Sequence, residues 1–364
     1  MMLKISSTFN FCEIFTEVAR RKKMTRFAVI TAIFILALTT SGCRKKYTAL
    51  DYFPFAENQY CEYDGDGHAL ANMQTFTGYV NGQRMQRRNS VNDEFPAQTE
   101  IFEYKNQTIT CIRADVSTYY IEDTTYLGAA MDLPILREPI ELGNEWSTRD
   151  GGKFTITAVN KRVTVPYGTF NAIEVTSEFP GARIEKNYYA PGVGLIETRY
   201  SIDNGPWIIS RLSKITKNHS LEIPVPALYV DPSDNGVYMQ EVSLTLKTNA
   251  DVSKEVEKIL KSRSPDDAYG PLISKGSMNF ITVMRADNTS QSYAIIDFNP
   301  EVYEINDSEE AESSWLYAVG CTIGMIYGVE YATIYVDGLP FSGRFIQLSP
   351  DDFIIVNDYE EEFY

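Results

Sequence analysis

The chain has 364 residues, a length that predicts two folded domains with additional chain outside them. Its composition, 44% hydrophobic and 23% charged, argues against wholesale disorder. The 33 Lys and Arg against 49 Asp and Glu give a formal net charge of −16, the opposite of what a nucleic-acid-binding protein needs to neutralise phosphates. With 2 histidines and 5 cysteines, a histidine-rich metal centre or a four-cysteine zinc site has almost no ligands to draw on.

A leader of the secretory type opens the chain. Residues 27–38 form an uncharged apolar run, and a basic segment precedes it, made of Arg20, Arg21, Lys22, Lys23 and Arg26. This order matches a signal peptide, and the run is shorter than the roughly 20 apolar residues of a spanning helix. A second methionine, Met24, stands just before the run, so translation starts at either Met1 or Met24.

Small residues follow the apolar run and end in a cysteine. Ser41-Gly42-Cys43 resembles the bacterial lipobox, although Thr40 stands where that motif usually has leucine. The resemblance implies a signal peptide over 1–42, a lipid on the thiol of Cys43 and a tether over 43–50. It further implies an exported protein anchored to the outer face of the cytoplasmic membrane. An acyl anchor is strong enough because each buried CH2 contributes about 0.8 kcal/mol. An ordinary secretory signal or a membrane anchor with an incidental cysteine is the alternative.

Three cysteines remain beyond the leader and Cys43. Cys61 and Cys111 fall in the same predicted domain, so an exported location permits a disulfide between them without requiring one. Cys321 falls on a predicted apolar helix, which indicates a buried small hydrophobe rather than a nucleophile.

Residues 51–221 consist of short β-like runs separated by turn residues. The runs cover 74–80, 100–104, 108–112, 153–159, 170–175 and 207–210. Asn81-Gly82 between alternating segments predicts a hairpin, and Pro166-Tyr167-Gly168 and Pro191-Gly192 predict two further turns. No segment has a long helical period. We therefore predict a mainly antiparallel β domain, either a curved sheet or a half-barrel.

Two phrases of this domain resemble a known kind of protein. Val165–Phe170 followed by Ala172–Val175, and then Tyr188–Ile196, are similar to segments of half-barrel lipoprotein carriers of the LolA/LolB type. The resemblance implies a cavity for an apolar ligand, which makes a carrier or sensor an alternative function.

The next segment predicts a domain boundary. Residues 222–236 contain Pro224, Pro226 and Pro232 and end in a cluster of turn residues. Proline stiffens such a stretch toward an extended spacer, so we predict a Pro-rich linker here.

The C-terminal part alternates strands and helices. Val242 to Leu246 alternates as a strand does, and Asp251 precedes a helix that ends near Leu260. Strands over 278–284 and 292–298, a helix that begins after Ser308, and a strand over 331–338 complete the order β-α-β-β-α-β. This order predicts a small βαββαβ sandwich, and the whole chain is then of the α+β class.

Three phrases in this part resemble the GerMN domain of spore-germination and sporulation proteins: Val242 to Leu260, Ala294 to Pro300 and Tyr331 to Gly338. Tyr269-Gly270-Pro271-Leu272 also fits the marked element that follows the first helix in that family. The resemblance covers 237–338 and implies an interaction role in an assembly rather than chemistry. Residues 339–364 remain as an extension that adds strands to a sheet edge and ends in an acidic tail.

A search for catalytic and metal sites yields only weak candidates. Asp64-Gly65-Asp66-Gly67-His68 lacks the further acidic ligands of a calcium loop and predicts a turn. His68 and His219 both stand in polar surroundings, so we predict surface histidines. Gly-rich phosphate loops, nucleophile elbows and His-Glu-x-x-His helices do not occur in the sequence.

Two other clusters have structural explanations. Gly320, Gly324 and Gly328 recur every four residues, which predicts a helix face that lies close to its sheet and a C-terminal cap at Gly328. The other cluster is Arg84, Arg87 and Arg88, which predicts a solvated hairpin face rather than an anion site.

The preferred function is therefore a non-enzymatic, lipid-anchored module that binds an envelope protein, in a sporulation or germination assembly if the host forms spores. We predict no catalytic residue, cofactor, metal or nucleic-acid partner. The alternatives are an apolar-ligand carrier in the β domain and a cell-wall hydrolase, the latter resting only on location and abundant carboxylates.

Overall fold

The computed structural model describes residues 46–91, 97–115, 121–284, 292–305 and 307–356. From Thr48 onward these residues belong to one compact unit. The predicted signal peptide, Cys43 and the acidic tail lie outside the described residues. Within the described part, every helix is too short or too polar to cross a bilayer.

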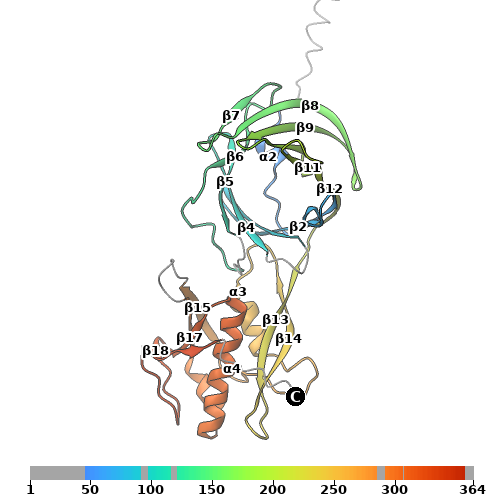
Figure 1. The fold of residues 1–364 in the computed structure, drawn as a ribbon. Coiled ribbons are helices and arrows are strands. Elements are labelled where there is room, and N and C mark those ends of the chain that lie inside the picture. The colour runs from blue at the N-terminus through green and yellow to red at the C-terminus, as the bar shows by residue number, and fades with distance from the viewer. Residues whose placement is uncertain (1–45, 92–96, 116–120, 285–291, 306, 357–364) are drawn as a thin grey trace, which may run out of the picture. The chain divides into compact units, whose positions relative to one another are not determined.

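Twelve antiparallel strands form a sheet that curls into a nearly closed barrel (Figure 1). The order is β6-β5-β4-β3-β2-β1-β12-β11-β10-β9-β8-β7. Consecutive strands therefore pair with each other except β6 and β7, which are the two ends of the sheet, and β12 returns to pair with β1. The bounds are β1 Tyr60–Asp66, β2 Met73–Asn81, β3 Arg84–Ser90, β4 Gln98–Lys105, β5 Thr108–Asp115, β6 Leu133–Arg137, β7 Glu145–Ser147, β8 Lys153–Val165, β9 Gly168–Phe179, β10 Arg183–Ala190, β11 Gly194–Ile202 and β12 Ile208–Thr216. The indole Nε1 of Trp146 donates to the carbonyl oxygen of Pro134 at 2.7 Å and so joins the two end strands.

A short helix lies inside this barrel (Figure 1). α2, Ala49–Tyr52, begins with a capping box at Thr48. Phe53 follows it and packs against Phe102 and Tyr189, with ring centroids 4.9 and 6.3 Å apart. The entering chain thus fills the interior with its own aromatic side chain, and the barrel is mainly antiparallel as predicted but more closed than a half-barrel.

The turn residues act where the sequence predicts turns. Gly82, with φ 60°, joins β2 to β3 in the left-handed region that glycine favours. Pro166 and Tyr167 join β8 to β9, and Pro191-Gly192-Val193 joins β10 to β11. Asp64 and Asp66 differ from the prediction, because they belong to strand β1 rather than to a turn.

The predicted linker contains a strand. β13, Leu221–Val230, pairs along its whole length with β14, Val237–Leu246, in a separate two-stranded sheet. The prolines at 224 and 226 misled the sequence interpretation. They stand two residues apart on an edge strand, so both backbone positions that lack an N–H group face the same side of the strand. An edge strand tolerates proline at such positions.

The remaining elements follow the predicted order β-α-β-β-α-β from β14 onward. They are α3 Val252–Leu260, β15 Met278–Met284, β16 Tyr293–Phe298, the 3₁₀ helix η2 Pro300–Ile305, α4 Glu309–Tyr327, β17 Tyr331–Val336, β18 Leu339–Pro340 and β19 Ile354–Ile355. The sheet order is β15-β16-β17-β18, with β19 also paired to β17. β16 and β17 are parallel, and the strands of the C-terminal extension add to β17 as predicted.

Helix α4 forms the centre of the C-terminal core. Ser308 caps its N-terminus, and Gly328, with φ 61°, ends it in the left-handed conformation. Trp315 is 3% exposed and donates its indole N–H to the carbonyl oxygen of Leu272 at 2.7 Å. A Cβ added at Gly324 would overlap the side chain of Val356, so the predicted close approach of the glycine face is confirmed and its partner is the segment after β19.

Candidate functional site

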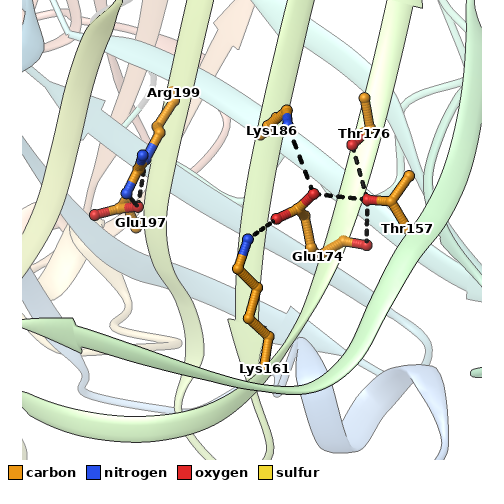
Figure 2. A network of polar contacts seen from close by, with 7 residues as sticks. All are labelled: Thr157, Lys161, Glu174, Thr176, Lys186, Glu197 and Arg199. Atoms are coloured by element: carbon orange, nitrogen blue, oxygen red, sulfur yellow. Dashed lines mark hydrogen bonds and ion pairs between the residues drawn. The ribbon is translucent and has the colours of Figure 1, made fainter.

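Two nearly buried carboxylates lie on strands β9 and β11, with β10 between them, and each is held by polar side chains of the barrel wall (Figure 2). Glu174 lies in β9, and its side chain is 7% exposed. Glu197 lies in β11, and its side chain is 1% exposed. Both lie on the same face, because Tyr188 of β10 pairs with Glu174 on one side and with Glu197 on the other.

Glu174 is held by three side chains drawn in Figure 2. Lys161 donates to Oε2, the Thr157 hydroxyl donates to Oε1 at 2.8 Å, and the Lys186 ammonium lies 3.7 Å from Oε1. Burial alone would raise the pKa of Glu174, but the hydrogen bonds from Lys161, Thr157 and Tyr188 outweigh it and lower the pKa to about 2. The carboxylate therefore stays ionised near neutral pH and has no proton to give to a substrate.

Glu197 is held by two guanidinium groups. Arg199 donates to Oε1 at 2.6 Å, and Arg211 donates to Oε2 at 3.1 Å. Both carboxylate oxygens are thus engaged, and the two sites together join five β-strands, β8 to β12, by hydrogen bonds and ion pairs. The arrangement suits structural support of the barrel wall better than acid–base catalysis.

Sequence reasoning missed both carboxylates. The signal was present, because Glu174 stands between Ile173 and Val175, and Glu197 follows Ile196, so each is an acid within an apolar strand. A charged residue in such a strand is buried only if it is paired.

The arginines of the predicted cluster lie in different surroundings, as Arg84 and Arg87 show. Arg84 pairs with Glu103 at 2.9 Å, and Arg87 pairs with Glu100 at 2.8 Å. The Arg87 side chain is only 18% exposed, and its guanidinium lies over the rings of Phe53 and Phe102 at 5.4 and 4.7 Å from the centroids. The prediction of a solvated hairpin face is therefore wrong for Arg87, because Phe102 of β4 and Phe53, which follows α2, cover it.

The three described cysteines, Cys61, Cys111 and Cys321, are buried, and none of them forms a disulfide with another. Burial raises the pKa of the Cys61 thiol and raises that of Cys111 to about 12, so neither is a thiolate near neutral pH. A Cys61–Cys111 disulfide, which the sequence left open, is not formed. Cys321 is 1% exposed on α4, as expected for a small hydrophobe.

The two histidines occupy different surroundings. His68 is exposed, as predicted. His219 is only half-exposed and stacks on Tyr60, with ring centroids 4.5 Å apart, while Phe76 meets it edge-on at 6.2 Å. His219 thus stays partly at the surface, and the segment after β12 also folds it onto aromatic side chains, which the sequence did not predict. Groups of His, Cys, Asp or Glu able to hold a metal are absent from the described residues.

The C-terminal sheet has an open edge. In the described part of the chain β15 pairs only with β16, so its other side carries backbone groups without a strand partner. The strand sequence Met-Asn-Phe-Ile-Thr-Val-Met contains neither a charge nor a proline. Soluble proteins usually protect such edges with charges, prolines or bulges. β15 has a register irregularity between Met278 and Phe280 but neither a charge nor a proline, so the rest of its edge indicates a pairing surface.

An apolar face adjoins this edge. Phe280 and Met284 are 44% and 48% exposed on β15. Met284 pairs in register with Tyr293 of β16, which pairs with Tyr331 of β17, and Phe353 packs on both tyrosine rings at 5.6 and 6.2 Å. We call these five residues the open face.

The sequence matches no protein-family model and no curated protein. Among solved structures, it is similar to a protein from Bacteroides fragilis described as exported with a YmcC-like fold: 11% identity, 46% of this chain, 99% of that chain, TM-score 0.29. It is similar to a protein from Parabacteroides distasonis described as a lipoprotein: 14% identity, 45% of this chain, 98% of that chain, TM-score 0.29.

A third likeness is to the tandem GerMN domains of the sporulation protein GerM from Bacillus subtilis. It has 15% identity over 32% of this chain and 40% of that chain, with a TM-score of 0.25. The similar structures thus include both kinds of protein that the sequence resembles, a lipoprotein and a GerMN domain.

Proposed function

We propose that this chain is a lipid-anchored envelope protein that binds an extended segment of another envelope protein along strand β15 and catalyses no reaction. The observation that carries the proposal is the uncharged, unpaired edge of β15 beside the open face. An extended peptide that adds to such an edge gains main-chain hydrogen bonds, and alternate side chains supply specificity.

The two sides of β15 offer different contacts to such a peptide. Ile281 and Val283 are half-buried at the rim of the C-terminal core, while Phe280 and Met284 belong to the open face. A partner strand would place alternate side chains on the two faces, one set beside Ile281 and Val283 and the other beside the open face. Thr282 lies between them, and its exposed side chain makes it a suitable place to introduce a charge.

Anchoring forms the second part of the proposal and rests on the lipobox resemblance at Cys43. Cys43→Ala is expected to abolish fatty-acid labelling and to release the protein from the membrane fraction. Cys61→Ala is the matched control and should keep both. A place in a sporulation or germination assembly rests on the GerMN resemblance and would apply in a spore-forming host.

Site-specific photocrosslinking in intact cells tests the binding proposal. Benzoylphenylalanine replaces Phe280, which is 44% exposed, and in a control it replaces Tyr167, which is 42% exposed in the β8–β9 turn. We expect a defined adduct from position 280 and none from position 167. Thr282→Lys should remove the adduct, because a lysine on an edge strand opposes pairing.

Other outcomes would contradict this proposal. The same adducts from both positions, or no adduct from position 280, would reject the β15 edge as the binding site. An adduct of twice the chain mass would assign the edge to self-association instead of a second protein.

The interior of the barrel gives little support to an apolar-ligand carrier. The pocket there, lined by Phe53, Tyr63, Thr75, Arg87 and Leu195 among others, holds about 40 Å³. Sites for drug-sized ligands measure about 300–1,000 Å³. Phe53, which follows α2, lines this pocket and packs on Phe102 and Tyr189, which narrows the interior further.

A further inference from the structure

Two tyrosines from different segments stack on each other near the turn between β13 and β14. Tyr238 is the second residue of β14, and Tyr269 lies in the segment between α3 and β15. Their ring centroids are 5.2 Å apart, and the ring planes differ by only 3°. Tyr238 is 40% exposed, and Met239 beside it is 48% exposed. The stack therefore presents aromatic surface to the solvent.

Two carboxylates adjoin the ring of Tyr238. A Cβ added at Gly236 would lie 3.0 Å from Oδ1 of Asp234 and 3.0 Å from Cε2 of that ring, so both groups border the same glycine. Gln240 stands on the same face of β14 as Tyr238, and its side-chain amide donates to Oδ2 of Asp266 at 2.8 Å. Two negative charges therefore lie beside the exposed stack.

The phenol of Tyr269 is affected by the same charges and by a third. Partial burial raises the pKa of Tyr269, and the charges of Asp231, Asp266 and Asp234 add to that effect. Uncharged groups donate to these carboxylates, namely backbone amides, a hydroxyl and a side-chain amide. Within the part of the chain that the structure describes, the ion pairs of this region belong to other acids. The three carboxylates thus keep a negative charge that no cation of the described chain balances.

A buried hydroxyl next to this group also lacks a partner. Tyr229 of β13 pairs in register with Tyr238, so both side chains lie on one face of the hairpin. Tyr229 is 1% exposed, and among the described residues its hydroxyl has no hydrogen-bond partner. Burial raises the pKa of Tyr229, and the charge of Asp266 adds to the effect, so this hydroxyl lies near the same carboxylate. An unpaired buried hydroxyl is unfavourable, which favours a ligand that brings further N–H donors to this group.

The barrel shows which group such rings and carboxylates hold together. The guanidinium of Arg87 lies 4.7 Å from the ring centroid of Phe102 and pairs with Glu100 at 2.8 Å. Arg199 lies 5.5 Å from the ring centroid of Tyr188 and also pairs with a carboxylate. At the β13–β14 turn the rings and the carboxylates are present, but no arginine or lysine of the described residues lies over either ring.

We propose that the Tyr238–Tyr269 stack, with the carboxylates of Asp231, Asp234 and Asp266, binds an arginine side chain of a partner protein. The guanidinium contacts the exposed part of the stack, and its N–H groups donate to the carboxylates. Arginine fits better than lysine, because its planar guanidinium is less strongly hydrated, stacks on rings and forms paired hydrogen bonds. The chain's net charge of −16 further attracts a basic partner. This site is separate from the β15 edge, so it can fail or hold independently of the proposed function.

Fluorescence anisotropy of a labelled short peptide, titrated with the full chain, tests the proposal. The peptide carries two arginines among glycines and serines, and two further versions carry lysine or citrulline instead. We expect the arginine peptide to bind at one site per chain and to bind more weakly as salt is added. Citrulline has nearly the same shape without the charge and should bind at least about tenfold more weakly. The lysine version should bind about two- to fivefold more weakly.

Tyrosine variants show whether the ring takes part. Tyr238→Leu removes the ring without changing the net charge and should weaken binding of the arginine peptide by about two- to fivefold. Tyr238→Phe keeps the ring and should bind as the wild type does. Tyr126→Leu is the matched control, since Tyr126 is 74% exposed in the segment between β5 and β6, and it should leave binding unchanged.

Aspartate variants separate this site from the general negative charge of the chain. Asp234→Asn keeps an oxygen that can accept from a backbone amide and should weaken binding by about two- to fivefold. Asp150→Asn removes one negative charge from an exposed position in the turn between β7 and β8, and it should change binding by less than about 1.5-fold.

Several results would overturn the proposal. Equal losses from Asp234→Asn and Asp150→Asn would mean that the net charge of the chain attracts the peptide. Equal binding of the arginine and citrulline peptides, unchanged binding by Tyr238→Leu, or no binding of the arginine peptide would reject the site. Lysine binding as tight as that of arginine would overturn the guanidinium as the group that is recognised.

Discussion

The barrel and the C-terminal sheet differ in how their edge strands are paired and in where their charged residues lie. The barrel brings its end strands together through Trp146 and buries two carboxylates, Glu174 and Glu197, each between two cations. The C-terminal sheet leaves β15 unpaired on one side and uncharged throughout. A nearly closed sheet has few unpaired backbone groups at which another chain could add as a strand. The open C-terminal sheet is therefore the better candidate for binding.

The largest expected effect on the free energy of unfolding comes from removing the aromatic side chain inside the barrel. Phe53→Ala removes a side chain that is 5% exposed and should lower the free energy of unfolding by about 3–5 kcal/mol. Phe345→Ala removes one that is 40% exposed and should change it by less than about 0.5 kcal/mol. Denaturant titrations measure both. Equal losses would mean that the interior is not packed around the entering chain.

The charge network should produce a pH-dependent effect of the next size. The pKa of Glu174 is lowered from 4.5 to about 2, so its contribution is complete above about pH 4.5 and is lost as the pH falls toward 2. Glu174→Gln should lower the free energy of unfolding by about 2–3 kcal/mol at pH 7, and the difference from the wild type should vanish near pH 2. Glu62→Gln, at an exposed pair, is the control. A difference that does not depend on pH would refute the ion-pair explanation.

A smaller effect is expected in the C-terminal region. Gly324→Ala places a methyl group against Val356 and should lower the free energy of unfolding by about 1–2 kcal/mol, since overpacking outweighs the better helix propensity. Gly270→Ala meets open space and should be neutral within about 0.5 kcal/mol. If Gly324→Ala stabilised the protein instead, the close packing of α4 against the last segment would be disproved.

The smallest effect on stability should accompany the largest effect on binding. Thr282→Lys lies on an exposed position of β15 and should change the free energy of unfolding by less than about 0.5 kcal/mol. Thr245→Lys, at an exposed position of β14, makes the same change elsewhere. Only the first should reduce partner binding. A loss of stability from Thr282→Lys, measured by thermal unfolding, would show that β15 tolerates no charge even when unpaired.

Local sequence patterns predicted the elements of the C-terminal region and the turns of the barrel. The caps at Ser308 and Gly328 and the turn at Gly82 depend on neighbouring residues, so the sequence contains them directly. The closure of the barrel depends on a contact between Trp146 and Pro134, and the pairing of β13 with β14 overrides the prolines. Such features arise from tertiary contacts.

The candidate sites show the same division. Lipidation at Cys43 is a local motif and stays a prediction. The partners of Glu197 are Arg199 on its own strand and Arg211 on the next one, and Arg211 reaches the carboxylate only through the pairing of β11 with β12. Strand register decides which charges meet, and composition does not reveal it.

The most direct test of the central claim is amide hydrogen exchange of residues 278–284, measured on the purified chain and on the same chain in intact envelopes. If β15 binds an extended segment, the amides on its open side should exchange freely in the purified protein and become protected in the envelope, while amides of β9 stay unchanged. Equal exchange of the β15 amides in both preparations would contradict the account.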